Sequence, residues 1–183
     1  NKKMIAMMLT LSMLAASLAG CAGGDDDDDA DWAISMASDV EVVWVESGWD
    51  PIIPNLNAGE MCDVIISAMT KTEARDQVVD FTRAYYTSSQ GVIGGSGSAS
   101  ISDVSELNAA GITVGVQSGT TSDIFANGDA DNMASLPEAT VVAYEDFPSV
   151  IAALDNGDVM YALGDAPVLS LEGTLMTQFS DEN

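Results

Sequence analysis

Short apolar runs and helix starts alternate along this chain, and this alternation constrains its fold more than any other feature. We expect strands at residues 40–45, 64–66, 112–116, 140–144 and 159–163. Helices are expected at residues 50–57, 73–78, 102–109 and 148–154, with another opening near 119, an extended stretch at 80–92 and a helix remnant at 32–37. Strands that alternate with helices are typical of parallel sheets. The pattern therefore predicts an α/β protein.

A segment rich in glycine and serine, residues 94–100, divides this pattern into two halves. Each half carries its own strands and helices, so we expect two small α/β lobes at residues 31–93 and 94–183. The extended stretch that ends near Val92 is expected to cross from one lobe to the other. A cleft between two such lobes is the usual place for a small ligand.

The most informative stretch for function is residues 63–87. A β-branched run at 64–66 opens into the small polar residues Ser67 and Thr70, and Arg75 follows a few positions later. Ligands of open α/β sheets bind at the carboxyl ends of the strands. Hydroxyl and backbone N–H groups at that edge, with a guanidinium that can form two parallel hydrogen bonds, suit a carboxylate ligand.

The charge of the chain makes Arg75 stand out. The sequence has 5 Lys+Arg against 29 Asp+Glu and no His, for a formal net charge of −24. Lys2 and Lys3 lie near the N-terminus, so Lys71, Arg75 and Arg83 are the basic residues of the remaining chain. So acidic a chain excludes nucleic acid and an anionic bilayer as electrostatic partners. We interpret Arg75 as placed for a ligand, whereas Arg83 is expected on a solvated helix face.

Residues 1–20 have the pattern of a signal peptide. Two lysines precede an apolar stretch that is too short, and at its end too rich in small residues, for a membrane span. The stretch ends in Leu18-Ala19-Gly20-Cys21, which resembles a bacterial lipobox. This resemblance implies cleavage before Cys21 and attachment of lipid to its thiol. An ordinary secretory leader is the alternative.

Five consecutive acidic residues follow, at 25–29, and their mutual repulsion predicts an extended, solvated tether over residues 21–30. A calcium site there would lack interleaved turn-forming ligands, so no metal is expected. With Cys21 lipidated, Cys62 has no cysteine left for a disulfide. Its place beside the strand at 64–66 predicts a buried small side chain.

With both halves laid out, the sequence resembles the extracytoplasmic solute-binding proteins of the polar amino-acid ABC importers (family 3). These proteins have the periplasmic-binding-protein type II fold, two α/β lobes with a ligand cleft. The resemblance covers roughly residues 31–170. Four segments in matching order carry it: WDPIIPNLNAGE at 49–60, DVIISAMTKTEARDQVVDFTRAYY at 63–86, VGVQSGTT at 114–121 and DNGDVMYALGDAPV at 155–168.

For the first lobe, the resemblance implies that Arg75 holds the α-carboxylate of the ligand. Thr70 and the backbone of Ala68 would assist it. Trp49 falls at a pocket-lining position, where its ring would cover the ligand side chain. A plain core position for Trp49 is the alternative interpretation.

For the second lobe, the resemblance implies that Gly119, Thr120 and Thr121 offer further donors to the carboxylate from a helix N-terminus. The helix dipole and the unpaired amides there favour an anion. A plain helix cap at 119–120 is the alternative. Asp165 matches the acid that accepts the ligand's α-ammonium, and it follows a predicted strand and a glycine at the sheet's carboxyl edge. An Arg and an Asp that face one zwitterion would define an amino acid's backbone.

The sequence departs from the family pattern at both ends. The family begins with a strand, an aromatic loop that stacks on the ligand and a glycine before the first helix. Here the acidic tether runs directly into Asp31 and Trp32, which resemble the middle of that helix. The crossover expected after the Asp165 helix is not found either. Both lobes are therefore expected to be incomplete, because the sequence is either a fragment or that of a degenerate relative.

The resemblance implies a monomeric, lipid-anchored binding protein on the outer face of the cytoplasmic membrane, in the periplasm or at the cell surface. It would capture a polar amino acid and present it to an ABC permease. No cofactor, metal or catalytic residue is expected.

Three alternatives remain open. A cyclohexadienyl or arogenate dehydratase on the same scaffold would need a general acid, for which Glu73 or Asp165 could serve, but no His is present for acid–base work. The same lobes could also form a ligand-sensing module. An acidic surface lipoprotein that binds no ligand is the third.

Overall fold

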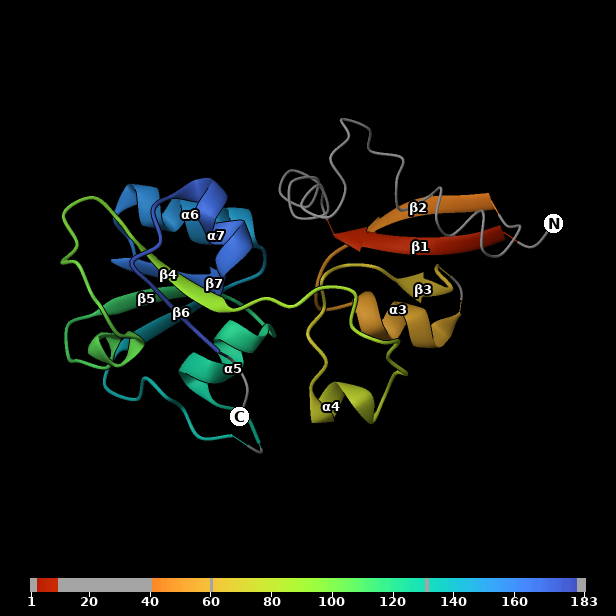
Figure 1. Ribbon diagram of the computed structural model, residues 1–183, viewed down its shortest axis with the longest axis horizontal. Coiled ribbons are helices and arrows are strands. Elements are labelled where there is room, and N and C mark those ends of the chain that lie inside the picture. Colours follow the sequence, from red (N-terminus) through yellow and green to blue (C-terminus); the bar gives the residue numbers. More distant parts are fainter. Residues whose placement is uncertain (1–2, 10–40, 60, 131, 181–183) are drawn as a thin grey trace. The chain divides into compact units, whose positions relative to one another are not determined.

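The strands of this chain form two separate sheets (Figure 1). The computed structural model describes residues 3–9, 41–59, 61–130 and 132–180. The chain divides into two compact units, Asn1–Tyr85 and Tyr86–Asn183. This boundary precedes the glycine- and serine-rich segment that was expected to mark it. The reason is that the strand beginning at Gln90 pairs within the second sheet.

The first unit carries a three-stranded parallel sheet in the order β2-β1-β3. Its strands are β1 (Lys3–Leu9), β2 (Glu41–Ser47) and β3 (Val64–Ile65). Helix α3 (Ile52–Ala58) connects β2 to β3 and ends at Gly59, whose φ of 67° is a left-handed cap that glycine adopts without strain. The short helix α4 (Glu73–Asp76) follows β3.

Strand β1 lies in the segment whose pattern predicted a signal peptide. It pairs with β2 along Lys3–Leu9 and with β3 at Ala6 and Met7. The first lobe was expected to lack its central strand, and the structure instead places β1 there. A short apolar run suits a leader as well as a strand buried in a parallel sheet. What distinguishes a buried strand from a leader is its pairing with two neighbouring strands. Amino-acid composition does not reveal this pairing. Cys21, the acidic tether and the expected helix at 32–37 lie outside the described residues.

A small apolar cluster joins α3 to β3. Ile52 and Cys62 are buried in it, and the side chains packed around them are Ile53, Leu56, Ile65 and Met69. Cys62 thus occupies the buried position that was predicted for it. Burial, and then the negative charge of Asp63, raise the pKa of the Cys62 thiol, which makes it a poor nucleophile.

The second unit carries a five-stranded mixed sheet in the order β6-β5-β7-β4-β8. Its strands are β4 (Gln90–Gly94), β5 (Thr113–Gln117), β6 (Thr140–Tyr144), β7 (Tyr161–Asp165) and β8 (Thr177–Phe179). Its helices are the 3-10 helix η1 (Val104–Leu107) and the α-helices α5 (Thr121–Asn127), α6 (Phe147–Asn156) and α7 (Ala166–Glu172). Strand β5 runs parallel to β6 and β7, whereas β4 runs antiparallel to β7 and β8.

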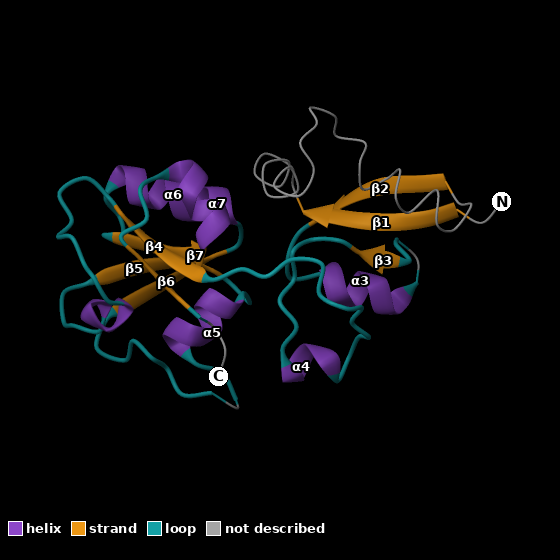
Figure 2. Ribbon diagram, in the orientation of Figure 1, coloured by secondary structure: helices purple, strands orange, loops and turns teal. Residues whose placement is uncertain are grey.

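Both faces of this second sheet are covered, with α6 and α7 on one face and α5 on the other (Figure 2). Successive side chains of a strand point to opposite faces. Val92 and Leu163 join the cluster that includes Ala126 of α5, whereas Ile93 and Ala162 join the cluster beneath α6 and α7. Because both faces are buried, β4 and β7 are apolar along most of their length and show no polar alternation.

Most predicted elements lie close to their expected bounds, and three differ. In place of the α-helix expected at 102–109, the structure has the shorter 3-10 helix η1, with Asp103 as its N-cap. Strand β7 begins later than expected, so that Asp165 is its last residue. Strand β8 was not predicted, whereas α7 is the helix that was expected to follow Asp165.

The two units repeat one arrangement. In each sheet the first strand of a parallel trio lies between the second and the third, as β2-β1-β3 and as β6-β5-β7. A helix that ends at a left-handed glycine, Gly59 or Gly157, connects the second strand to the third. Each unit therefore has its own edge where the carboxyl ends of parallel strands meet.

Across the described ranges, no helix combines the length and the apolar character that crossing a bilayer would need.

Candidate ligand-binding site

Arg75 is held by the two threonines that precede it. Its backbone N–H donates to the hydroxyl of Thr72 (3.2 Å), which caps α4. Its guanidinium Nη1 donates to the backbone carbonyl of Thr70 (2.8 Å). The side chain is 9% exposed. The segment Thr70-Lys71-Thr72 therefore turns the guanidinium back toward the carboxyl end of β3.

The ring of Trp49 lies against the same guanidinium. The distance from Cζ of Arg75 to the centre of the ring is 5.2 Å, within the range of a cation–π contact. Trp49 is half-buried in the connection between β2 and α3, where its carbonyl accepts the N–H of Ile52. Because β2 and β3 are parallel, their carboxyl ends face the same edge, and the two residues meet there.

Ala68 follows β3 in a strained backbone conformation. Its φ of 48° is unusual for a residue other than glycine. Such strain costs about 1–3 kcal/mol and is often found at ligand sites. The N–H of Ala68 donates to the hydroxyl of Tyr85 (2.9 Å). The preceding hydroxyl, of Ser67, is buried and has no hydrogen-bond partner among the described residues.

Two basic residues near Arg75 in the sequence, Lys71 and Arg83, lie at the surface. Lys71 is exposed and its Nζ is 2.8 Å from Oδ1 of Asp76, which is also exposed. Exposed ion pairs of this kind contribute little to stability. Arg83 is exposed as predicted, but it lies in an irregular segment after α4 and not on a helix face, whereas Arg75 is buried. Burial thus separates the candidate ligand-binding cation from the two solvated ones.

In the second unit, the turn from β5 into α5 forms a reciprocal helix cap. Gly119 has a φ of 69°, and its N–H donates to Oδ2 of Asp123 (2.9 Å). The hydroxyl of Thr120 accepts the N–H of Asp123 and donates to the carbonyl of Gln117 (2.7 Å). A carboxylate of the chain itself therefore occupies an anion position at this helix N-terminus, as the helix-cap interpretation anticipated.

Asp165 ends β7 at the same edge. Its Oδ1 accepts a hydrogen bond of 2.6 Å from Nε2 of Gln90, the residue directly opposite it on β4. The same Nε2 donates to the hydroxyl of Thr121 (3.2 Å). Gln90 thereby links the first residue of α5 to the predicted ammonium-binding acid.

The predicted residues thus form one group in each unit. In the first unit, Arg75 contacts Trp49 and Thr70, and Ala68 follows the same strand. In the second unit, Thr121 and Asp165 meet through Gln90. Within the described parts of the chain, no set of three His, Cys, Asp or Glu side chains is arranged to hold a metal ion.

Gln90 and Tyr85 were missed by the sequence analysis. Both lie in the stretch that was expected to be merely extended. Gln90 is an amide directly before a buried apolar run, and a polar residue in that place is a signal that could have been used. Nothing in the local sequence of Tyr85 points to Ala68, because the two residues meet only in the folded unit.

A family model describes the same region of the chain. The model of the bacterial extracellular solute-binding proteins, family 3, matches residues 29–163. A probable histidine-binding protein of Campylobacter jejuni is 32% identical over 132 residues, which is 72% of this chain and 48% of that protein. The lysine/arginine/ornithine-binding periplasmic protein of Escherichia coli is 32% identical over 136 residues, 74% of this chain and 49% of that protein. The chain therefore spans about half the length of these relatives.

A solved structure supports the same fold. The crystal structure of the ancestral amino acid-binding protein AncCDT-1, a precursor of cyclohexadienyl dehydratase, superposes with a TM-score of 0.77 at 24% identity. The match covers 95% of this chain and 77% of that chain. The fold is thus the type II fold of periplasmic amino-acid-binding proteins, as the sequence predicted.

Proposed function

Because this chain belongs to the bacterial extracellular solute-binding proteins of family 3, we propose that it binds a polar amino acid outside the cytoplasm and delivers it to an ABC importer. The observation that carries the proposal is the buried guanidinium of Arg75, oriented by Thr70 and Trp49 at a sheet edge where ligands bind. A planar guanidinium in such a place suits a carboxylate.

In the proposed complex, the first unit holds the ligand's carboxylate. Arg75 forms two parallel hydrogen bonds to it, and Thr70 and the N–H of Ala68 assist. The ring of Trp49 covers the ligand side chain while it steadies the guanidinium. Because Arg75 is buried in a chain that is otherwise strongly acidic, it provides a local positive site for an anionic group.

The second unit holds the other half of the amino acid's backbone. Asp165 accepts hydrogen bonds from the α-ammonium, and Gly119, Thr120 and Thr121 donate further bonds to the carboxylate. The cap formed by Asp123 must open for the N–H of Gly119 to reach the ligand.

We further propose that the protein works as a monomer on the outer face of the cytoplasmic membrane. A lipid on Cys21 would anchor it there, and the acidic run at 25–29 would act as a tether. Its partners would be the amino acid and the membrane permease. Mass spectrometry of the lipidated peptide from cells would test the anchor.

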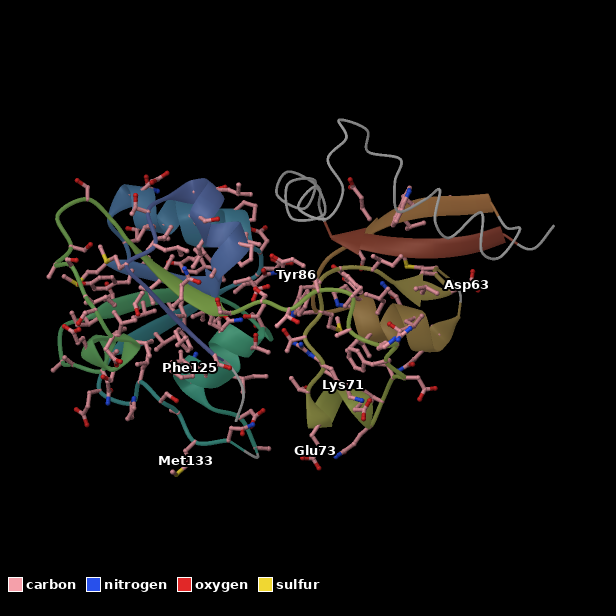
Figure 3. The ribbon with its side chains drawn as sticks, viewed as in Figure 1. Asp63, Lys71, Glu73, Tyr86, Phe125 and Met133 are labelled. Atoms are coloured by element: carbon pink, nitrogen blue, oxygen red, sulfur yellow. The ribbon has the colours of Figure 1, made fainter. Side chains whose placement is uncertain are left out.

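Binding without turnover fits the residues better than catalysis. The likeness to AncCDT-1, at 24% identity, supports a shared fold and leaves activity open. Glu73, one of two candidate general acids, lies on α4 and is exposed, as Figure 3 shows. Turnover of prephenate or arogenate by the purified protein would reverse this assignment.

Substitution of Arg75 tests the proposal. Thermal unfolding of the full chain is measured with each common L-amino acid, since ligand at about 100 times its Kd stabilises the native state by about 2.7 kcal/mol. Arg75→Ala and Arg75→Met should abolish the shift. Arg83→Ala, which removes the same charge from an exposed position of the same unit, should retain it. Retained binding in cooperatively folded Arg75 variants would contradict the proposal.

A further inference from the structure

Gln90 is the most completely buried polar side chain of the second unit, at 1% exposed among the described residues. Its Oε1 accepts a short hydrogen bond from the hydroxyl of Ser122. Its Nε2 donates to Oδ1 of Asp165 at 2.6 Å and to the hydroxyl of Thr121 at 3.2 Å. An amide nitrogen carries two N–H donors. These contacts fix which end of the amide faces which partner.

The sheet places Gln90 where it can do this. Gln90 begins β4 and lies directly opposite Asp165, the last residue of β7. Cross-strand partners in an antiparallel pair project from the same face, so their side chains meet. The backbones are joined beside this pair as well, since the N–H of Ala166 donates to the carbonyl of Ser89 (2.8 Å). The amide is therefore held between the end of β7 and the start of α5.

We propose that Gln90 is a positioning residue that holds Asp165 in the orientation that receives the ligand's α-ammonium. This inference rests on the proposed function. A carboxylate with one oxygen tied to a buried amide keeps its orientation before the ligand arrives. The side chain of Asp165 then loses less conformational freedom when the ligand binds, which strengthens the contact between its carboxylate and the α-ammonium. Gln90 itself does not touch the ligand in this proposal.

Two nearly isosteric substitutions separate this role from packing. Gln90→Met removes all three hydrogen bonds and keeps the volume close to that of the amide. Gln90→Glu keeps an acceptor for Ser122 and places a second carboxylate against Asp165. The matched control is Gln117→Met. Gln117 is also a buried glutamine at the end of a strand, and its side chain reaches the carbonyl of Glu145 instead.

The binding measurement compares each amino acid with its analogue that lacks the α-ammonium. We use the pairs L-histidine and imidazolepropionate, L-arginine and guanidinovalerate, and L-glutamine and glutaramate, by calorimetry on the full chain. Gln90→Met should raise the Kd for the amino acid by about tenfold or more, because the carboxylate of Asp165 loses the hydrogen bond that supports it. The same substitution should change the Kd for the deaminated analogue by no more than about threefold. Gln90→Glu should raise the Kd for the amino acid more than Gln90→Met does, because it places a second negative charge beside Asp165. Gln117→Met should leave the Kd values for the amino acid and its analogue unchanged, or change both by the same factor.

A second measurement needs no ligand. Urea midpoints are compared for the wild type, Gln90→Met, Asp165→Asn and the double variant, and the two substitutions should be non-additive because the side chains are in contact. Additive midpoints, or equal losses for the amino acid and its analogue, would overturn the positioning role alone. Wild-type protein that binds none of the amino acids overturns the proposed function and the ammonium role with it. The urea cycle would then still decide whether Gln90 supports Asp165.

Discussion

The guanidinium of Arg75 lies 5.2 Å from the centre of the Trp49 ring, although Trp49 lies in the connection after β2 and Arg75 lies in α4, which follows β3. Because β2 and β3 run parallel in the same sheet, the segments that follow them meet at one edge, and this brings Trp49 and Arg75 together. Trp49 was predicted to cover the ligand side chain, and here it contacts the residue predicted to bind the carboxylate. An aromatic ring in this place orients the cation and shields it from water.

Replacement of Trp49 should weaken amino-acid binding through Arg75. A cation–π contact is worth about 0.5–2 kcal/mol, so Trp49→Leu should raise Kd by about two- to thirtyfold. Trp49→Phe, which keeps an aromatic face, should cost less. Calorimetry on both variants checks this order. Equal losses for Leu and Phe would mean that the ring serves the ligand side chain or the fold and not the guanidinium.

Removal of the Tyr85 hydroxyl should strengthen binding modestly. The hydroxyl accepts the N–H of Ala68, a proposed donor to the ligand's carboxylate, so the ligand must displace it. A neutral hydrogen bond contributes about 0.5–1.5 kcal/mol net, so Tyr85→Phe should lower Kd by up to about tenfold. Tyr86→Phe, at the exposed neighbouring ring, is the control and should have no effect. Weaker binding in Tyr85→Phe would instead place its hydroxyl on the ligand.

The cap of α6 should make stability depend on acid pH. Hydrogen bonds from Ser149, from its side chain first and then its backbone N–H, lower the pKa of Asp146. A carboxyl whose pKa is lowered on folding stabilises the native state above its unfolded pKa, and this stabilisation is lost as pH falls through the folded pKa. Asp146→Ala should therefore cost about 1 kcal/mol of unfolding free energy at neutral pH, and the deficit should be smaller at acid pH, below the folded pKa of Asp146.

Urea unfolding at both pH values measures that difference. Asp155→Ala is the control, because Asp155 is an exposed acid in the last turn of the same helix. Loss of a negative charge near a helix C-terminus is neutral or slightly stabilising. A deficit for Asp146→Ala that persists unchanged at acid pH would show that its carboxylate is not the stabilising group.

Removal of β1 should expose the core of the first unit, and Cys62 reports on it. Cys62 is 3% exposed, and burial raises the pKa of its thiol, so it should react slowly with a thiol reagent in the full chain. A chain that starts at residue 22 lacks the strand between β2 and β3. Its Cys62 should react at least about tenfold faster, because local opening costs less free energy.

The full chain for this comparison carries Cys21→Ser, so that Cys62 is its remaining thiol. Equal rates would mean that the first unit keeps its core without β1. Cleavage before Cys21 would then be compatible with a folded first unit. A large difference would mean that processing at the lipobox and the sheet of this structure exclude one another in the same molecule.

Local sequence was sufficient for most of the secondary structure. Strand β6 has the predicted bounds, and the caps of α4 and α5 are the threonines Thr72 and Thr120. These features depend on a few neighbouring residues, whose propensities and capping groups the sequence displays. Arg75 stands out as a candidate from the sequence, because basic residues are scarce after the N-terminal segment and because it follows a predicted strand.

Only the tertiary structure decided which polar groups share an edge. Gln90 is separated by 75 residues from Asp165 and by 32 from Ser122, so no local pattern connects them. The antiparallel pairing of β4 with β7 brings Gln90 to Asp165, and the packing of α5 on this sheet brings Ser122 to Gln90. Likewise, the apolar composition of Lys3–Leu9 is compatible with a leader or a strand, and its pairing with β2 and β3 made it a central strand here. Sequence specifies short-range preferences directly, whereas register and neighbour are settled by contacts that form only when the whole sheet assembles.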